Sequence, residues 1–170
     1  MNTVIVYNSR TGFTETYARQ LAAALDGRAI PLREAQRAGL GSPDVVIFGT
    51  RAHCGGIDRL GQGLRLLRQS GAGRGAFFVT GAVPAEAEQE IAALWARNLR
   101  EDVPHFYVPA GLRYEGMGFT DRLLMRVFAF MLGRKKDKSE SERQMERSIA
   151  SSYDFSSPDF FEPVLTWARS

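Results

Sequence analysis

Three hydroxyl-bearing side chains follow one another closely near the N-terminus. They are Ser9, Thr11 and Thr14, in the segment Ser9-Arg10-Thr11-Gly12-Phe13-Thr14. The unpaired N–H groups and the dipole at a helix start attract anions, so this segment suits a phosphate if a helix follows it. Gly12 lets the backbone approach a ligand closely. The segment predicts a phosphate-binding loop; the alternative is that its hydroxyls only form turns and cap the helix.

The wider pattern narrows the class of phosphate ligand. The chain contains neither the G-x-x-x-x-G-K-[ST] pattern of nucleoside triphosphate sites nor the G-x-G-x-x-G pattern of dinucleotide sites. A single phosphate group is therefore favoured over a pyrophosphate.

The elements on either side of the loop give it the context that a phosphate site needs. The run Thr3–Tyr7 is β-branched and aromatic, which is typical of a buried strand. After the loop, apolar residues recur at helical spacing, namely Phe13, Tyr17, Ala18, Leu21, Ala22 and Leu25. Asp26-Gly27 is expected to end this helix. The loop thus joins the carboxyl end of a strand to the start of a helix.

The rest of the chain continues the alternation of strands and helices. Further strands are predicted at 28–32, 44–49, 76–80 and 105–109. Three further helices are predicted from apolar residues at helical spacing. The inner face of the first is Ile57, Leu60, Leu64 and Leu67, and that of the second, which has Pro84 in its first turn, is Ile91, Leu94, Trp95 and Leu99. The third follows the cap Ser157-Pro158 and has the inner face Phe161, Val164, Leu165 and Ala168. This alternation predicts an α/β fold, a doubly wound parallel sheet with helices on both faces. Ligands of such sheets bind beyond the carboxyl ends of the strands.

Composition limits the class of protein. The 170 residues are expected to form one globular domain, residues 1–170. The single cysteine, Cys54, excludes a disulfide framework and a Cys-rich zinc site. The net charge is +3, but basic residues are mixed with acids along the chain, so no nucleic-acid partner is expected. The first residues do not resemble a signal peptide, and we expect a cytoplasmic protein.

An inserted segment at about 111–150 separates the last predicted strand from the last helix. Within it, the run Leu123–Leu132 carries one charge in ten positions and is too short to span a bilayer. We expect a helix at 120–133, started by Thr120 and Asp121 and followed by Arg134-Lys135-Lys136. Its apolar surface either packs into the domain, forms a homodimer, or contacts the inner face of a membrane peripherally.

The first 14 residues resemble a known family. The stretch Val4-Ile5-Val6-Tyr7-Asn8-Ser9-Arg10-Thr11-Gly12-Phe13-Thr14 is similar to the flavodoxin signature, an apolar strand followed by [ST]-x-T-G-x-T. This resemblance implies a flavodoxin-like five-stranded parallel sheet in the order 2-1-3-4-5, with an extra apolar helix after the last strand. It also implies that residues 9–14 hold the phosphate of FMN.

A narrower resemblance concerns the branch that contains menaquinone-dependent protoporphyrinogen oxidase. It rests on Gly49-Thr50-Arg51, on Ala110-Gly111-Leu112-Arg113-Tyr114 and on the apolar helix from Thr120. It implies an FMN-dependent oxidoreductase that passes electrons between a reduced organic substrate, such as a porphyrinogen, and a quinone-like acceptor. The alternatives are a flavodoxin-type electron carrier without its own substrate and a flavin-binding interaction module.

The family resemblance also implies which residues flank the flavin. They are Thr50, Arg51, Ala52, His53, Cys54 and Gly55 after the third strand, Thr80, Gly81, Ala82 and Val83 after the fourth, and Tyr114. Arg51 would stabilise reduced, anionic flavin, unless it only forms a surface ion pair. His53 would exchange protons with a substrate, although a satisfied polar role is common for histidine. We expect catalytic roles for Arg51 and His53, and a packing role for Cys54.

Overall fold

The computed structural model describes residues 1–149, 152–154 and 156–170. Its strands are β1 Thr3–Tyr7, β2 Arg28–Pro31, β3 Val45–His53, β4 Gly56–Ile57, β5 Arg74–Gly81, β6 His105–Pro109, β7 Gly111–Leu112 and β8 Tyr153–Asp154. Its helices are α1 Phe13–Ala24, α2 Leu32–Ala38, α3 Leu60–Gln69, α4 Glu88–Asn98, α5 Phe119–Arg134, α6 Glu140–Ser148 and α7 Glu162–Arg169, with short 3-10 turns η1 Tyr114–Gly116 and η2 Pro158–Phe161.

The central sheet has the predicted order. Its parallel strands run β2-β1-β3-β5-β6, which is 2-1-3-4-5 when the parallel strands alone are numbered, and the short β4 pairs antiparallel with the end of β3. The β1–β3 register pairs Ile5 with Ile47, and the β3–β5 register pairs Phe48 with Phe77. The flavodoxin-like fold class is therefore confirmed.

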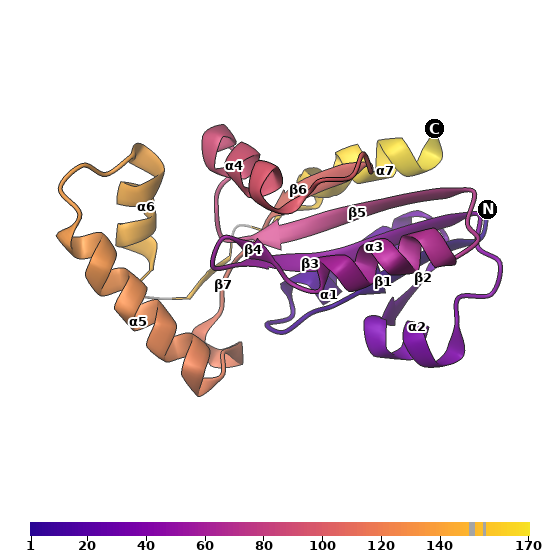
Figure 1. Cartoon of the computed structure of the whole chain (residues 1–170), viewed down its shortest axis with the longest axis horizontal. Helices are drawn as coiled ribbons and strands as arrows, with labels where there is room; N and C mark the ends of the chain where they lie inside the picture. The colour runs from indigo at the N-terminus through magenta and orange to yellow at the C-terminus, as the bar shows by residue number, and fades with distance from the viewer. Residues whose placement is uncertain (150–151, 155) are drawn as a thin grey trace.

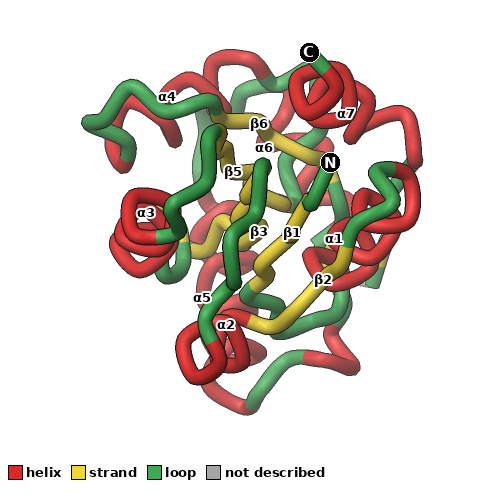
Figure 2. The backbone as a smooth tube through the Cα atoms, turned by 90° about the vertical axis from the view of Figure 1, so that its right-hand side faces the viewer, coloured by secondary structure: helices red, strands yellow, loops and turns green. Residues whose placement is uncertain are grey.

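Alternate residues along the strands point to opposite faces of the sheet and pack into two separate cores, as expected for strands covered on both faces. On one face Ile5, Ile47 and Phe78 pack with residues of α1 and α7. On the other, Val6, Phe48 and Phe77 pack with residues of α2, α3 and α4. Figure 2 shows the result end-on, with α1 and α7 on one side of the sheet and α2, α3 and α4 on the other. Because β1, β2, β3, β5 and β6 are parallel, their carboxyl ends lie at the same edge of the sheet.

The inserted segment lies at that edge. The elements β7, α5, α6 and β8 stand beyond the carboxyl ends of the strands, at the end of the molecule opposite the two chain termini (Figure 1). Antiparallel pairing of β7 with β8 closes the segment, with Gly111 opposite Asp154. The helix predicted at 120–133 is present as α5.

Three details differ from the sequence-based expectations. The short α2, which buries only Leu32 and Ala35, was not predicted. Ile57, expected on the face of the following helix, belongs to β4 because Ala52 pairs with it in a hairpin. Pro84, expected in the first turn of α4, precedes that helix, since its carbonyl accepts from Ala87 in a separate turn before Glu88.

Candidate functional site

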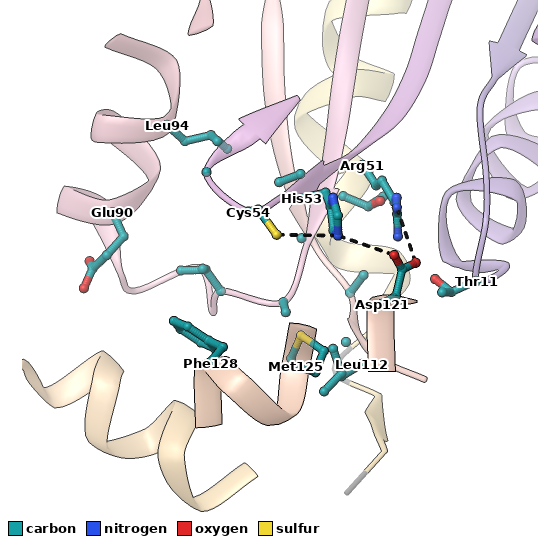
Figure 3. Close-up of a pocket in the computed structure, with 18 of the residues that line it drawn as sticks. Thr11, Arg51, His53, Cys54, Glu90, Leu94, Leu112, Asp121, Met125 and Phe128 are labelled. Carbon is teal, nitrogen blue, oxygen red and sulfur yellow. Dashed lines mark hydrogen bonds and ion pairs between the residues drawn. The ribbon is translucent and has the colours of Figure 1, made fainter. Parts of the chain in front are cut away.

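A single cavity of about 680 Å³ collects most of the predicted site residues. Its walls come from the loop after β1, the β3–β4 hairpin, the loop after β5, the helix α4, the segment after β6 and the helix α5 (Figure 3). Those of the predicted residues that line it are Thr11, Phe13, Arg51, Ala52, His53, Cys54, Gly55, Thr80, Gly81, Ala82 and Val83. This volume is within the range of about 300–1,000 Å³ that is usual for small-molecule sites.

The predicted phosphate loop has the backbone geometry of an anion site. Gly12 precedes α1 with φ 96°, and its N–H donates to the Ser9 Oγ at 3.2 Å. Among the described residues no side chain caps α1, so the first N–H groups of this 12-residue helix stay available. Thr11 faces the cavity. The loop can therefore offer backbone N–H groups and a hydroxyl to a phosphate.

The Thr14 hydroxyl makes a contact within the protein. Its Oγ1 lies 2.8 Å from the Thr80 Oγ1, and Thr80 in turn donates to the Thr50 carbonyl at 3.3 Å. These three residues are almost completely buried, and they join α1 to the ends of β3 and β5. Thr14 thus fixes the position of the loop through its side chain, while its backbone N–H lies in the first turn of α1.

The loop expected after the third strand is a β-hairpin. β3 continues to His53, because Thr50 and Arg51 pair with β5 and Ala52 and His53 pair with β4. Cys54 and Gly55 form its turn with φ values of 50° and 74°, the positive pair typical of a two-residue hairpin turn. The hairpin gives the predicted flavin-flanking residues a fixed backbone.

Arg51 is held by an acid on the same hairpin. Its Nε donates to the Asp58 Oδ2 at 2.7 Å, and the side chain is only 13% exposed. Arg51 therefore lines the cavity and also forms an ion pair. Much of its charge is offset by Asp58.

The loop after β5 is anchored by Tyr107 on β6. The Tyr107 hydroxyl donates to the Val83 carbonyl at 2.9 Å and accepts from the Val83 N–H at 3.0 Å. Burial raises the pKa of Tyr107 far above its usual range, so the hydroxyl stays protonated as a donor. At Gly81 an added Cβ would collide with the Tyr107 ring, which explains the glycine. The backbone of residues 81–83 is therefore rigidly placed on the cavity wall.

Four charged residues that line the cavity were not predicted as site residues, namely Glu90, Arg97, Arg113 and Asp121, and the last two lie near the phosphate loop and the hairpin. Arg113 lies over the phosphate loop, with its guanidinium 4.0 Å from the Phe13 ring centroid and close to Gly12. Asp121, in the first turn of α5, lies between Arg10, Arg51 and His53. Arg113 and Asp121 are each about 100 residues from the phosphate loop in sequence. An acid at a helix start also has an ordinary explanation as a capping residue.

Arg113 is held in place by Asp154 on β8, whose carboxylate accepts at 2.9 Å. Partial burial opposes ionisation of Asp154, but hydrogen bonds from Ser156 and Arg113 outweigh it and lower the pKa of this carboxyl. The return strand of the inserted segment therefore positions a cation at the phosphate loop.

The remaining predicted residues lie around the cavity without lining it in the described part of the chain. Ser9 and Gly12 form the backbone of the loop, and the half-exposed Arg10 reaches toward Asp121. Thr50 is buried, where its hydroxyl donates to the Asp58 carbonyl at 2.6 Å. Tyr114 begins η1, and its side chain is outside the described residues.

The side of the cavity away from the phosphate loop is mainly apolar, although Glu90 and Arg97 of α4 also line the cavity. Ile91 and Leu94 of α4 line it on one side, and α5 contributes Leu124, Met125, Val127, Phe128 and Met131 on the other. Figure 3 shows Leu94 and Phe128 on these two facing helices, with the hairpin residues between them and the phosphate loop. The cavity thus extends from the predicted phosphate loop at one end to an apolar region at the other.

These features define a doubly wound α/β protein with a ligand cavity at the carboxyl ends of its strands. Residues 4–139 match the family model described as the flavodoxin domain. The chain belongs to the flavodoxin domain family. Among curated proteins, no sequence matches the chain.

Several solved structures are similar to the chain. A flavodoxin from the domain Archaea is 15% identical, with a TM-score of 0.42, and the match covers 72% of this chain and 93% of that one. The Trp repressor binding protein from Bacillus subtilis is 15% identical, with a TM-score of 0.41, covering 81% and 100% of the two chains. A Fusobacterium nucleatum flavodoxin variant bound to flavin mononucleotide is 10% identical, with a TM-score of 0.38, covering 66% and 78%.

Proposed function

We propose that this protein binds FMN non-covalently and acts as an FMN-dependent oxidoreductase. The observation that carries this proposal is the continuity of the cavity. It runs from Thr11 in the phosphate loop, past the hairpin residue His53 and the loop residue Ala82, to the apolar walls of α4 and α5. A flavin has the same order of parts, with a phosphate at one end and a large, flat ring at the other.

The donor set of the site fits each part of FMN. The uncapped start of α1 offers N–H groups to the phosphate, and Arg113 lies close enough to Gly12 to offset its charge. Ala82 and Val83, held by Tyr107, and the hairpin from Arg51 to Gly55 provide two walls for the ring. When bound, FMN supplies the redox chemistry, and the protein supplies positioning and electrostatics.

The apolar end of the cavity supports an organic substrate and a quinone-like acceptor. Leu124, Phe128 and Met131 are 42–64% exposed although they face the cavity, so they offer an unfilled apolar surface beside the proposed ring position. Porphyrinogen oxidation, suggested by the resemblance in sequence, is one reaction of this class.

The positions of Arg51 and His53 in the cavity support the roles that we propose for them. Arg51 and His53 line the cavity on one strand, with Arg51 fixed by Asp58 and His53 Nε2 at 3.6 Å from the Cys54 Sγ. Arg51 supplies positive charge near the ring, which favours the reduced, more negative form. His53 is placed to exchange a proton with a substrate at the cavity.

We further propose that the outer face of α5 docks on an anionic membrane surface. Phe119, Leu123 and Phe130 are 52–83% exposed and lie outside the cavity lining. Arg122, Arg126 and Arg134 are interspersed with them along the helix. Exposed apolar residues combined with basic ones are characteristic of interfacial helices. No helix within the described residues is long and apolar enough to cross a membrane.

The spectrum of the protein during stepwise reduction tests the proposed function. We expect the purified protein to be yellow, to bind FMN in preference to FAD or riboflavin, and to take up two electrons in one transition. Two well-separated one-electron transitions would favour an electron carrier. A protein that binds no flavin on reconstitution would favour an interaction module.

A further inference from the structure

Asp121 is the buried acid of the cavity. It is the third residue of α5 and is 8% exposed. A residue at this place in a helix often caps the first turn, but no side chain caps α5 within the described part of the chain. Its Oδ2 is buried and has no hydrogen-bond partner among the described residues. The carboxylate points into the cavity between Arg51 and Thr11 (Figure 3).

Three basic side chains surround this carboxylate without hydrogen bonding to it. The Oδ2 lies 3.5 Å from the Arg10 Nε and 4.0 Å from the Arg51 Nη2, and the Oδ1 lies 4.0 Å from the His53 Nε2. The two arginine separations allow charge attraction, and all three separations exceed the usual length of a hydrogen bond. A buried carboxylate oxygen without a donor is unfavourable, so the site favours a ligand that brings a donor.

The position of Asp121 identifies the part of the ligand that it faces. Arg10 belongs to the phosphate loop, whereas Arg51 and His53 belong to the hairpin proposed to flank the ring. Asp121 contacts both groups and therefore borders the interval between them. In FMN that interval is crossed by the ribityl chain, which carries three hydroxyl groups.

We propose that Asp121 accepts hydrogen bonds from the ribityl hydroxyls and so selects flavins that carry this chain. The inference rests on the proposed binding of FMN. The other polar parts of FMN fit Asp121 less well. The phosphate is an anion that offers acceptors and repels a carboxylate, and the ring belongs beside the apolar walls of α4 and α5.

Three related ligands separate these contributions. FMN carries ring, ribityl chain and phosphate; riboflavin lacks the phosphate; lumiflavin lacks both phosphate and chain. Quenching of flavin fluorescence gives a dissociation constant for each with the full-length protein. We expect Asp121→Ala to weaken FMN and riboflavin by a similar factor of about 10- to 100-fold, because a charged hydrogen-bond acceptor is lost. Lumiflavin binding should change by less than about twofold.

Two further variants make the test specific. Asp121→Asn keeps the size and one acceptor oxygen, so its losses for FMN and riboflavin should be smaller than those of Asp121→Ala. Asp137→Ala removes the same charge from an exposed position after α5 and should leave all three constants unchanged. Thermal unfolding without ligand checks that each variant is folded. If Asp121→Ala does not fold, the comparison of the three ligands is made with Asp121→Asn alone.

The outcomes separate this inference from the proposed function. Equal weakening of all three ligands by Asp121→Ala or Asp121→Asn would overturn the role of the ribityl chain. Tighter binding of FMN alone would also overturn it, because it would show that Asp121 mainly repels the phosphate. If the unchanged protein binds lumiflavin but not FMN, or binds none of the three, the proposed function itself fails.

Discussion

The parallel sheet buries its apolar residues, whereas the helix α5 exposes most of its own. All five residues of β1 are buried, and the last six residues of β5 are buried as well. In α5, which has 16 residues, only Asp121 and Leu132 are buried, while large apolar residues such as Phe119 and Phe130 are exposed. The sheet uses its apolar residues for its own stability. The helix leaves most of its large apolar side chains exposed.

The largest expected effect is on the free energy of unfolding, when one phenylalanine in each region is truncated to alanine. Phe78 on β5 is completely buried, and Phe128 on α5 is 42% exposed. Phe78→Ala should lower the free energy of unfolding by about 3–5 kcal/mol, whereas Phe128→Ala should change it by less than about 0.5 kcal/mol. Urea unfolding of both variants measures the difference. Similar losses would show that α5 is part of the core.

The next effect concerns two threonines of the phosphate loop. Thr11→Val should weaken FMN about tenfold and leave riboflavin unchanged, because Thr11 faces the cavity and the phosphate is missing from riboflavin. Thr14→Val breaks the buried contact with Thr80, so it should lower stability by about 1 kcal/mol and affect both flavins alike. Titrations with the two flavins distinguish these cases. Equal losses for Thr11→Val would show that the phosphate is held elsewhere.

A smaller effect is expected on the midpoint potential of the flavin. Arg51→Gln should lower it by about 20 mV, which corresponds to about 1 kcal/mol for a two-electron couple, because positive charge near the reduced form is lost. Asp58→Asn should raise it, since Arg51 then lacks its ion-pair partner. Redox titration with a reference dye measures both shifts. An unchanged potential in folded Arg51→Gln would place Arg51 away from the ring.

The smallest effect should appear at the outer face of α5. Phe130→Ser should reduce association with vesicles containing phosphatidylglycerol by about threefold, since an exposed ring that inserts only partly contributes a fraction of its full transfer free energy. Phe128→Ser, on the cavity face of the same helix, serves as the matched control and should leave association unchanged. A monomer–dimer shift in Phe130→Ser without any effect on vesicles would assign the face to a second copy of the chain.

The sheet was predictable because its strands are short, continuous apolar runs. Thr3–Tyr7 and His105–Pro109 have the predicted bounds. The short α2 was missed because two buried residues in seven give little periodic signal. Ile57 was misassigned because one apolar residue fits a helix face and a hairpin equally well.

The candidate site was predictable only where it follows the strands. Residues 9–14, 50–55 and 80–83 lie at the carboxyl ends of β1, β3 and β5, which the parallel strands place at one edge, and the family resemblance implied residues 50–55 and 80–83. Arg113 and Asp121 reach the site through the inserted segment, whose path over the edge of the sheet has no periodic signature. Their roles depend on tertiary contacts that a pattern along the chain does not contain.

The anchoring of the loop after β5 has a consequence for protein engineering. Two tyrosine hydroxyls form hydrogen bonds with its backbone. Tyr107 bonds to the N–H and carbonyl of Val83, and Tyr153 donates to the Ala82 carbonyl at 3.2 Å. Neither contact uses the side chain of Ala82 or Val83. Libraries randomised at these two positions can therefore remodel the wall of the cavity while the loop keeps its course, which makes this loop a favourable place to change which ligands the cavity accepts.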